Sequence, residues 1–276
     1  MTLNFETSGQ LTIDMRPYIK AMFEEMPESM KGASATPAAT YLFDTRNSAP
    51  KLEGKDKDQY HSMSAKLLYL SQFGWPDICT AAAFLSTRVQ SPDKDNKKKL
   101  GKVMKYLQST LDKMLTIKSG DSVEVIWYVD ASYGVHPDRK SHTGTVMMFN
   151  GGAGAVYTTS NRQKIMTRSL TEAELVAVHG VFPQVIWARN FLSAQGFVMG
   201  PSTVFQDNKS AILLEKNGQA SSGKHTRHID VRYFFAKDCV ESGNIKIEHC
   251  PTKDMLADFF TNPYKEIYFG SFGTKY

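Results

Sequence analysis

The stretch V123-E-V-I-W-Y-V-D-A-S-Y-G134 decides the fold. Residues 125–129 are all β-branched, apolar or aromatic, a composition typical of a strand buried on both faces in the middle of a sheet. Asp130 follows this apolar run directly. An ionised carboxylate in such a place costs free energy unless a cation or another partner neutralises it. The stretch therefore predicts a central strand that carries a functional acidic residue.

Three other carboxylates lie in or beside apolar segments farther along the chain. Glu174 is in SLTEAELVAV, Asp207 follows TVFQ, and Asp258 is in TKDMLADFF. With Asp130 they occupy, in order, a strand, a helix, the end of a strand and a helix, so they can converge on a pair of divalent cations. Two such ions, about 3.5–4 Å apart, can activate water and neutralise a scissile phosphate. The four carboxylates therefore predict hydrolysis of a phosphodiester.

Each carboxylate also has a structural interpretation. Asp130 can form a buried salt bridge, and Asp207 can cap the helix that follows it. Glu172 competes with Glu174, but the two lie on different helix faces, and Glu174 shares the apolar stripe expected to face the sheet. Asp258 competes with Asp254, which suits the start of a helix better than Asp258 does.

The composition is that of an ordinary globular protein. The chain has 276 residues, of which 41% are hydrophobic and 22% charged, enough for two modest domains. No apolar stretch approaches the length of a membrane span, about 20 residues, and the N-terminus lacks the pattern of a signal peptide. We expect no membrane association and a cytoplasmic or nuclear location.

The cysteines favour reduced, packed thiols. There are three of them, an odd number, and they are widely spaced, which disfavours a disulfide framework. His225 and His228 precede Cys239 and Cys250, but these cysteines are eleven positions apart. Structural zinc sites usually pair cysteines two to four positions apart, so zinc is disfavoured.

The charge is compatible with a polyanionic partner. The net charge is +5 and the isoelectric point is about 8.9, which by itself does not establish such a partner. Two segments concentrate the basic residues. One contains Lys94, Lys97, Lys98, Lys99, Lys102 and Lys105, and the other contains Lys224, Arg227, Arg232 and Lys237. For each segment the structural alternative is a solvated helix face.

The hydrophobic pattern divides the chain near residue 120. Residues 1–15 alternate around a Ser-Gly turn and predict a β-hairpin, followed by a short amphipathic helix at 16–26. Residues 28–58 are rich in Ser, Ala, Pro, Gly and charge and predict an extended surface connection. Residues 60–115 have the spacing of three helices.

From residue 123 onward strands and helices mix. The first strand is followed by two more, joined at Asn150-Gly151-Gly152, and then by a long helix from 167 to 192 that Pro183 should kink or divide. Next come a short strand, a helix ending at Gly218, a helix at 227–240, a strand and a final helix in KDMLADFF.

Several segments together resemble the ribonuclease H domain of Ty1/copia-type retrotransposon polyproteins. The end of the palm of such a reverse transcriptase is resembled by LNFETSGQLTIDMRPYI. The thumb and connection that follow it are resembled by KLLYLSQFGWPDICTAAAFLSTRVQSP. The segments that carry the ribonuclease H resemblance are YVDASYG, KSHTG, NRQKIMTRSLTEAELVA, DNKSA, KHTRHIDVRYFF and CPTKDMLADFFT. The resemblance implies an α/β, ribonuclease H-like fold with a mixed five-stranded sheet and flanking helices, preceded by a small, mainly helical module. The implied division is palm and linker at 1–59, thumb and connection at 60–120, ribonuclease H at 121–265 and a tail at 266–276.

The resemblance also implies the roles of individual residues. Asp130 would bridge two Mg²⁺ ions, for which Mn²⁺ is a possible substitute, Glu174 and Asp207 would hold the first ion, and Asp258 the second. The substrate would be an RNA/DNA hybrid, recognised through its groove shape, phosphates and 2′-hydroxyls. The residues expected to contact it are Ser132, Gln163, Asn208, His225, Arg227, His228 and the lysines Lys98, Lys102 and Lys105.

No polymerase activity is expected from this chain alone. Tyr128-Val129-Asp130-Ala131 imitates the Tyr-x-Asp-Asp turn of polymerases, but alanine occupies its fourth position. We interpret Tyr128 to Asp130 as part of the first ribonuclease strand. The remainder of the polyprotein is an expected partner, with a virus-like particle as the location if the element is active; the oligomeric state is left open.

Two other functions are compatible with the fold. A domesticated or decayed copy would grip a hybrid without cutting it, although all four carboxylates are present. An integrase of the same fold would end its acidic set with a catalytic glutamate, whereas the fourth position here is Asp258. Cleavage assays on hybrid, duplex DNA and single-stranded RNA separate these possibilities.

Overall fold

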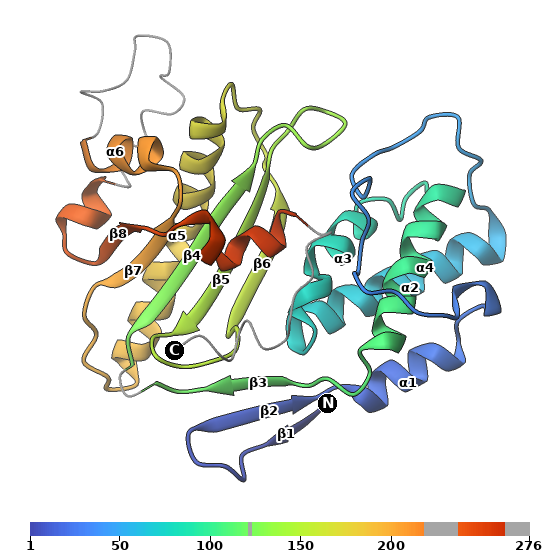
Figure 1. Ribbon diagram of the computed structural model, residues 1–276, viewed down its shortest axis with the longest axis horizontal. Helices are drawn as coiled ribbons and strands as arrows, with labels where there is room; N and C mark the ends of the chain where they lie inside the picture. The colour runs from blue at the N-terminus through green and yellow to red at the C-terminus, as the bar shows by residue number, and fades with distance from the viewer. Residues whose placement is uncertain (121–122, 218–236, 263–276) are drawn as a thin grey trace. The chain divides into compact units, whose positions relative to one another are not determined.

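A computed structural model describes residues 1–120, 123–217 and 237–262 of the chain (Figure 1). The chain forms two compact units. The first unit contains Met1–Lys118, Ala153–Ser160 and Asn262–Tyr276, and the second contains Ser119–Gly152 and Asn161–Thr261.

A three-stranded antiparallel sheet belongs to the first unit. The predicted hairpin is present as β1 (Thr2–Asn4) and β2 (Gln10–Asp14). β3 (Leu115–Lys118) pairs with the free edge of β2 and was not expected from the sequence. Its four residues carry too little pattern to predict a strand, because the pairing partner lies about a hundred positions earlier in the chain.

Helices supply most of the core of the first unit. They are α1 (Arg16–Glu24), η1 (Glu28–Met30), α2 (Gly54–Phe73), η2 (Pro76–Ile78), α3 (Cys79–Ser86) and α4 (Lys94–Ser109). α4 begins with a capping box, in which the Asp93 carboxylate accepts from the Asn96 amide and the Asn96 side chain accepts from the Asp93 amide. Its predicted apolar face, which includes Leu100 and Leu107, is fully buried.

The connection at residues 28–58 is not the surface segment that we expected. Ala38, Leu42, Phe43 and Leu52 are buried in the same core as the helices. These apolar residues are spaced irregularly, so their burial leaves no periodic signal in the sequence.

A mixed five-stranded sheet has the order β6-β5-β4-β7-β8. The strands are β4 (Val125–Ser132), β5 (His142–Phe149), β6 (Tyr157–Arg162), β7 (Ser202–Gln206) and β8 (Ile245–His249). β4 is central, pairs antiparallel with β5 and parallel with β7, and β7 pairs parallel with β8. The predicted α/β fold with a mixed five-stranded sheet is therefore confirmed.

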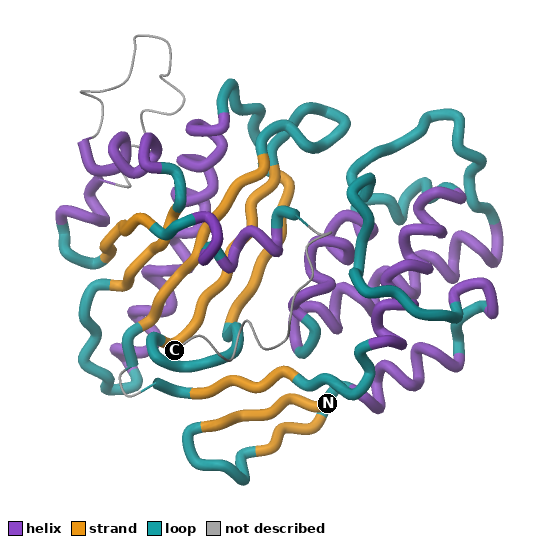
Figure 2. Tube along the Cα trace, in the orientation of Figure 1, coloured by secondary structure: helices purple, strands orange, loops and turns teal. Residues whose placement is uncertain are grey.

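Helices and 3₁₀ segments flank the sheet (Figure 2). α5 (Leu170–Ala194) packs against β4 and β5 through an apolar face that includes Val178 and Phe182. Pro183 lies inside this helix without dividing it. α6 (Lys209–Asn217) follows β7.

The C-terminal acidic segment differs from the helix that we expected in KDMLADFF. It forms two 3₁₀ helices, η4 (Thr252–Asp254) and η5 (Leu256–Phe260), and η5 packs against β4 and β5. Most of the helix predicted at 227–240 lies outside the described residues.

The expected reduced thiols are present, since all three cysteines are free and buried. Within the described ranges no helix has the length and apolar character needed to cross a membrane.

Candidate active site

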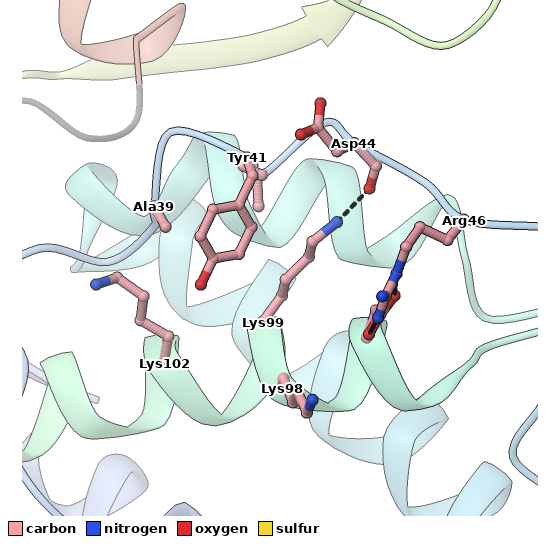
Figure 3. A pocket seen from close by; sticks show the side chains of 9 residues that line it. Ala39, Tyr41, Asp44, Arg46, Lys98, Lys99 and Lys102 are labelled. Atoms are coloured by element: carbon pink, nitrogen blue, oxygen red, sulfur yellow. Dashed lines mark hydrogen bonds and ion pairs between the residues drawn. The ribbon is translucent and has the colours of Figure 1, made fainter. Parts of the chain in front are cut away.

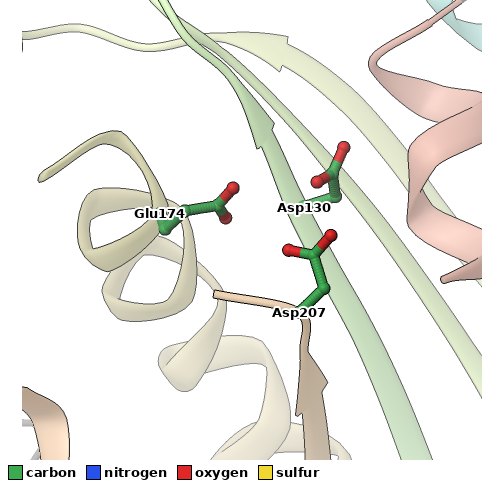
Figure 4. Close-up of side chains that lie close together, drawn as sticks. All are labelled: Asp130, Glu174 and Asp207. Atoms are coloured by element: carbon green, nitrogen blue, oxygen red, sulfur yellow. The ribbon is translucent and has the colours of Figure 1, made fainter. Parts of the chain in front are cut away.

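Three of the four predicted carboxylates converge on one point. Asp130, Glu174 and Asp207 each offer an oxygen, and these oxygens lie within 4.8 Å of one another. Figure 4 shows the three side chains pointing toward each other from β4, from α5 and from the turn after β7. Glu174 and Asp130 are 2% and 8% exposed, and Asp207 is half-buried.

Each carboxylate is fixed by the element that carries it. Asp130 lies in the central strand, where it pairs across the sheet with Gly144. Glu174 lies near the start of α5, a helix whose N-terminus is capped by the Ser169 hydroxyl accepting from the Glu172 amide. Asp207 directly follows β7, the parallel neighbour of β4. Strand ends and a helix start therefore bring residues 130, 174 and 207 together.

The group is electrostatically unfavourable without a cation. Burial raises the pKa of Glu174 well above its ordinary value, and the nearby charges of Asp130 and Asp207 raise it further. The polar groups of the Ala131 backbone and the Gln206 side chain partly oppose this shift of the Glu174 pKa. Glu174 Oε2 is buried and has no hydrogen-bond partner among the described residues. An all-oxygen donor set with an unsatisfied buried oxygen fits a hard divalent cation such as Mg²⁺.

Asp258 lies outside this close group but is linked to it. It is 8% exposed on η5. The hydroxyl of Thr261 donates both to Asp130 Oδ2 and to the backbone carbonyl of Asp258, the latter at 3.2 Å. Thr261 thus joins the Asp258 segment to the central strand. The metal-binding role of Asp258 stays a prediction.

Gly144 makes room for this segment on the sheet. A Cβ atom at this position would lie 2.6 Å from the backbone oxygen of Ala257 and 2.8 Å from the Cβ atom of Phe260. No side chain larger than hydrogen fits unless η5 moves. The glycine opposite Asp130 therefore allows η5 to approach the acidic group.

The hydrogen bonds of Asp207 and Glu172 bear on the competing interpretations of the acidic residues. Asn208 Oδ1, not Asp207, accepts from the Ala211 amide at the start of α6, while Asp207 Oδ2 accepts from the Thr252 hydroxyl at 2.8 Å. Glu172 accepts from the Arg168 amide at 2.6 Å and is outside the acidic group.

Two predicted substrate contacts have different surroundings. Gln163 is buried, and its Nε2 donates to Thr143 Oγ1 at 3.0 Å and to the Ala173 carbonyl at 2.8 Å. Its amide group thereby ties the residue after β6 to β5 and to the first turn of α5. Ser132 is half-buried at the end of β4. Both contacts stay predictions.

The remaining predicted contacts lie elsewhere in the chain. His225, Arg227 and His228 lie outside the described residues. Lys98 is exposed, and Lys102 and Lys105 are half-buried, on α4 of the first unit.

Sequence reasoning missed two neighbours of the acidic group. Thr261 donates to Asp130, and Gln206 lies beside Glu174. Gln206 precedes Asp207 at the end of a strand, so strand alternation offered a weak signal. Thr261 offered none, since its position depends on the path of the 3₁₀ segment.

Curated relatives place the chain in a family. A retrovirus-related Pol polyprotein from transposon TNT 1-94 of Nicotiana tabacum is 31% identical over 262 residues, covering 92% of this chain and 19% of the relative. The corresponding polyprotein from transposon RE2 of Arabidopsis thaliana is 31% identical, covering 87% of this chain and 16% of the relative. The chain thus spans less than a fifth of either relative. No protein-family model matches.

Solved structures with related folds include two that match different shares of the chain. A ribonuclease H1 isolated from compost has a TM-score of 0.38 and 16% identity, covering 51% of this chain and 94% of that one. A foamy viral protease-reverse transcriptase in complex with RNA/DNA hybrid has a TM-score of 0.46 and 13% identity, covering 73% of this chain and 26% of that one. The family assignment rests on the sequence relatives: the chain belongs to the retrovirus-related Pol polyproteins of Ty1/copia-type transposons, as a segment matching a part of them.

Proposed function

We propose that the chain is a ribonuclease H-type endonuclease that hydrolyses the RNA strand of RNA/DNA hybrids, as part of a retrotransposon reverse transcriptase. The observation that carries this proposal is the convergence of Asp130, Glu174 and Asp207 on one point beside the central strand. The relatives are Pol polyproteins of transposons, and such an element needs to remove RNA from hybrids during reverse transcription.

The cofactor in this proposal is a pair of Mg²⁺ ions, with Mn²⁺ as a substitute. Asp130, Glu174 and Asp207 would hold them, and Asp258 would join from η5. When bound, such ions supply an activated water and neutralise charge on the scissile phosphate. The ligands fit this role because all are carboxylates and the buried oxygen of Glu174 lacks a described partner.

The residues of the chain hold and orient the acidic group. The Thr261 hydroxyl donates to Asp130 Oδ2 and so fixes the orientation of this carboxylate. Thr252 does the same for Asp207. Because these donors are part of the fold, the carboxylates need little rearrangement before they act.

Substrate recognition would come from phosphate and ribose contacts. Asn208 caps α6 through its Oδ1, so its amide nitrogen is the group that would face a strand beside Asp207. Ser132, Gln163, His225, Arg227 and His228 complete the proposed set. Such contacts recognise a hybrid by shape and 2′-hydroxyl rather than by base sequence.

The test is cleavage of a labelled RNA/DNA hybrid with and without Mg²⁺. The RNA strand should be cut only with the metal, whereas duplex DNA and single-stranded RNA should be spared. Glu174→Gln should abolish cleavage and Glu172→Gln should retain it, because only Glu174 lies in the acidic group. A hybrid that binds but is never cut would favour the domesticated binding protein, and equal cutting of duplex DNA would move the enzyme toward an integrase-like class.

Polymerase activity is not part of the proposal. Asp130 lies within β4, and Ala131 and Ser132 continue the strand, so the Tyr128–Asp130 stretch does not form the turn that polymerases use. Primer-extension assays should therefore show no synthesis by this chain alone. The remainder of the polyprotein is the proposed partner for that reaction.

A further inference from the structure

The outer face of α5 carries no charge along most of its length. Residues 175–194 include one charged side chain, Arg189. Its guanidinium donates to the backbone carbonyls of Met199 and Gly200, beyond the end of the helix. A surface helix normally turns a charged face toward water, whereas a helix that is apolar on all sides is normally covered on all sides. The outer face of α5 therefore suits a protein partner better than solvent.

α4 has the ordinary pattern of a surface helix in the same chain. Leu100 and Leu107 on its apolar face are buried, and lysines follow its other side. Figure 3 labels Lys98, Lys99 and Lys102 of this helix, where residues 39–46 cross above it. The lack of charge on the outer face of α5 is therefore a property of that helix and not of the chain's composition.

The exposed residues of α5 recur at the spacing of a helix-packing seam. Five exposed positions follow one another at intervals of four, three, four and three residues: Gly180, Gln184, Trp187, Phe191 and Ala194. We call them the α5 seam. One α-helix packs along another with this spacing. The partner that fits the seam is therefore a second helix.

Two aromatic rings form the centre of the α5 seam. Trp187 is 66% exposed and Phe191 is 50% exposed. Their rings are stacked, with centroids 5.3 Å apart and an angle of 10° between the planes. Burying such rings supplies a large hydrophobic free energy, and exposed tryptophans often anchor interfaces between proteins. The stacked pair is therefore the expected anchor of a helix packed on the seam.

The order of side-chain sizes makes the α5 seam complementary to itself. Its ends, Gly180 and Ala194, are small, and its centre is large. Two copies of α5 placed antiparallel about a two-fold axis at Trp187 bring Gly180 of each copy opposite Ala194 of the other, and Gln184 near Phe191. Nothing lies within 4 Å of a Cβ atom placed at Gly180, so a second backbone can approach there. No charge on the seam faces its own copy across the axis, and antiparallel helices oppose their dipoles favourably.

We propose that the α5 seam binds the same seam of a second copy of the chain, as an antiparallel helix pair centred on Trp187. Glu174 lies on the buried side of the same helix, so the pairing does not use the acidic group. At 1.5 Å per residue, the two copies of Glu174 stand about 40 Å apart along the paired helices. This inference does not depend on the proposed function.

The first test is analytical ultracentrifugation of the full chain from about 1 to 200 µM. One helix seam is smaller than the standard interface of about 800 Å² per partner, so the dimer should have a Kd of roughly tens of micromolar.

Tryptophan fluorescence shows whether the dimer uses the seam. The three tryptophans all lie in the described ranges, and Trp75 and Trp127 are 0% and 1% exposed. Quenching by acrylamide therefore reports on Trp187, and it should fall as the protein concentration rises and the dimer forms.

A charge placed on the seam should separate the two copies. Trp187→Glu should raise the Kd of the dimer at least about thirtyfold, the effect of losing an anchoring tryptophan. The matched control is Leu213→Glu on α6, which adds the same charge at a residue that is 57% exposed and should leave the Kd unchanged. If Trp187→Glu does not unfold cooperatively on heating, Phe191→Glu replaces it and must raise the Kd in the same way.

Disulfide cross-linking tests the antiparallel direction. The native cysteines are buried, so mild oxidation of the parent should give no linked dimer. A mixture of Gly180→Cys and Ala194→Cys should give one, whereas each variant alone should not, because identical positions lie at opposite ends of an antiparallel pair.

Three results would each overturn the inference. A parent that stays monomeric over the whole concentration range does not pair through α5. A dimer that has the same Kd in Trp187→Glu and Leu213→Glu, or that forms without protecting Trp187 from acrylamide, uses another surface. Cross-linking of each cysteine variant alone, but not of the mixture, shows a parallel pair. Because none of these measurements uses a nucleic acid, absence of hybrid cleavage overturns the proposed function and not this interface.

Discussion

At the scale of single residues, the acidic group sets catalysis against stability. Three carboxylate oxygens within 4.8 Å repel one another, and burial disfavours the charged form of Glu174. Groups that repel one another in this way are usually retained because activity needs them, although they lower the free energy of unfolding.

Glu174→Gln should therefore stabilise the protein when no metal is present. The amide removes a buried charge, which is worth on the order of 1 kcal/mol or more. Thermal unfolding at pH 8 in a chelator should show a higher Tm for Glu174→Gln than for the parent, and no increase for Glu172→Gln. A lower Tm for Glu174→Gln would show that its charge is already paired in the folded chain.

Thr261 is expected to act through Asp130. Thr261→Val keeps the shape but removes the hydroxyl that donates to the carboxylate. A hydrogen bond to a charged group contributes about 1.5–3 kcal/mol, so kcat should fall roughly ten- to a hundredfold with little change in KM. Thr261→Ser should recover most of the loss. Equal kcat values for the valine and serine variants would show that the hydroxyl has no positioning role.

At the scale of elements, the contact between η5 and β5 depends on one glycine. Gly144→Ala would place a methyl group 2.6 Å from the Ala257 backbone oxygen, so η5 has to move. We expect lower stability, by roughly 1–3 kcal/mol as in other overpacked sites, and weaker cleavage.

Gly180→Ala is the matched control on α5. A Cβ atom there meets nothing within 4 Å, and alanine is favoured over glycine in a helix by about 1 kcal/mol. Urea unfolding should show Gly180→Ala as more stable than the parent and Gly144→Ala as less stable. The same sign for both would contradict the steric argument.

The contact between two buried histidines predicts sensitivity to acid. His136 Nε2 and His142 Nδ1 lie 2.9 Å apart, and burial lowers the pKa of His136 to about 4 and of His142 to about 3. Both pKa values lie below the unfolded value of about 6.5. Protons therefore bind the unfolded chain first, and stability that is complete above pH 6.5 is lost as the pH falls toward 4.

The free energy of unfolding should decrease by several kcal/mol between pH 6.5 and 4, at about 1.4 kcal/mol for each unit by which a pKa is lowered. Denaturant unfolding at each pH measures it. His142→Phe should flatten the profile in this window. An equally steep profile in that variant would assign the acid sensitivity to other groups.

Except for β3, the sequence revealed the strands, and it also singled out the acidic residues, because both leave local signals. Asp130 stands out as a charge at the end of an apolar strand, and the helices recur at helical spacing. The 3₁₀ form of residues 252–260 could not be predicted, because it depends on packing against β4 and β5. Lys99 likewise looked like its solvated neighbours, and only the segment crossing above α4 buries it.

At the scale of the whole molecule, the first unit is built from separate parts of the chain. Ala153 and Ala155 are buried, and the backbone of Ala153 exchanges hydrogen bonds with Lys118 at 2.7 and 3.1 Å. Residues 153–160 therefore belong to a unit whose main part is made more than thirty residues earlier.

A chain lacking residues 1–118 should leave Ala153 without Lys118, whereas residues 157–160 keep β5 as the neighbouring strand. We expect amide hydrogen exchange at 153–156 to be faster than in the full chain, because the backbone bonds to Lys118 are lost. Residues of β4 should keep their protection, since β5 and β7 remain. Unchanged exchange at 153–156 would show that these residues do not depend on Lys118.

The same chain path has a consequence for synthesis on the ribosome. A nascent chain emerges from its N-terminus, so the helices of the first unit are complete long before residues 153–160 leave the exit tunnel. Between these two moments the Lys118 backbone lacks that of Ala153, with which it exchanges hydrogen bonds in the finished protein. The first unit is the first to emerge, but its fold is complete only after much of the second unit has been translated. The order in which the two units are translated is therefore not the order in which their folds are completed.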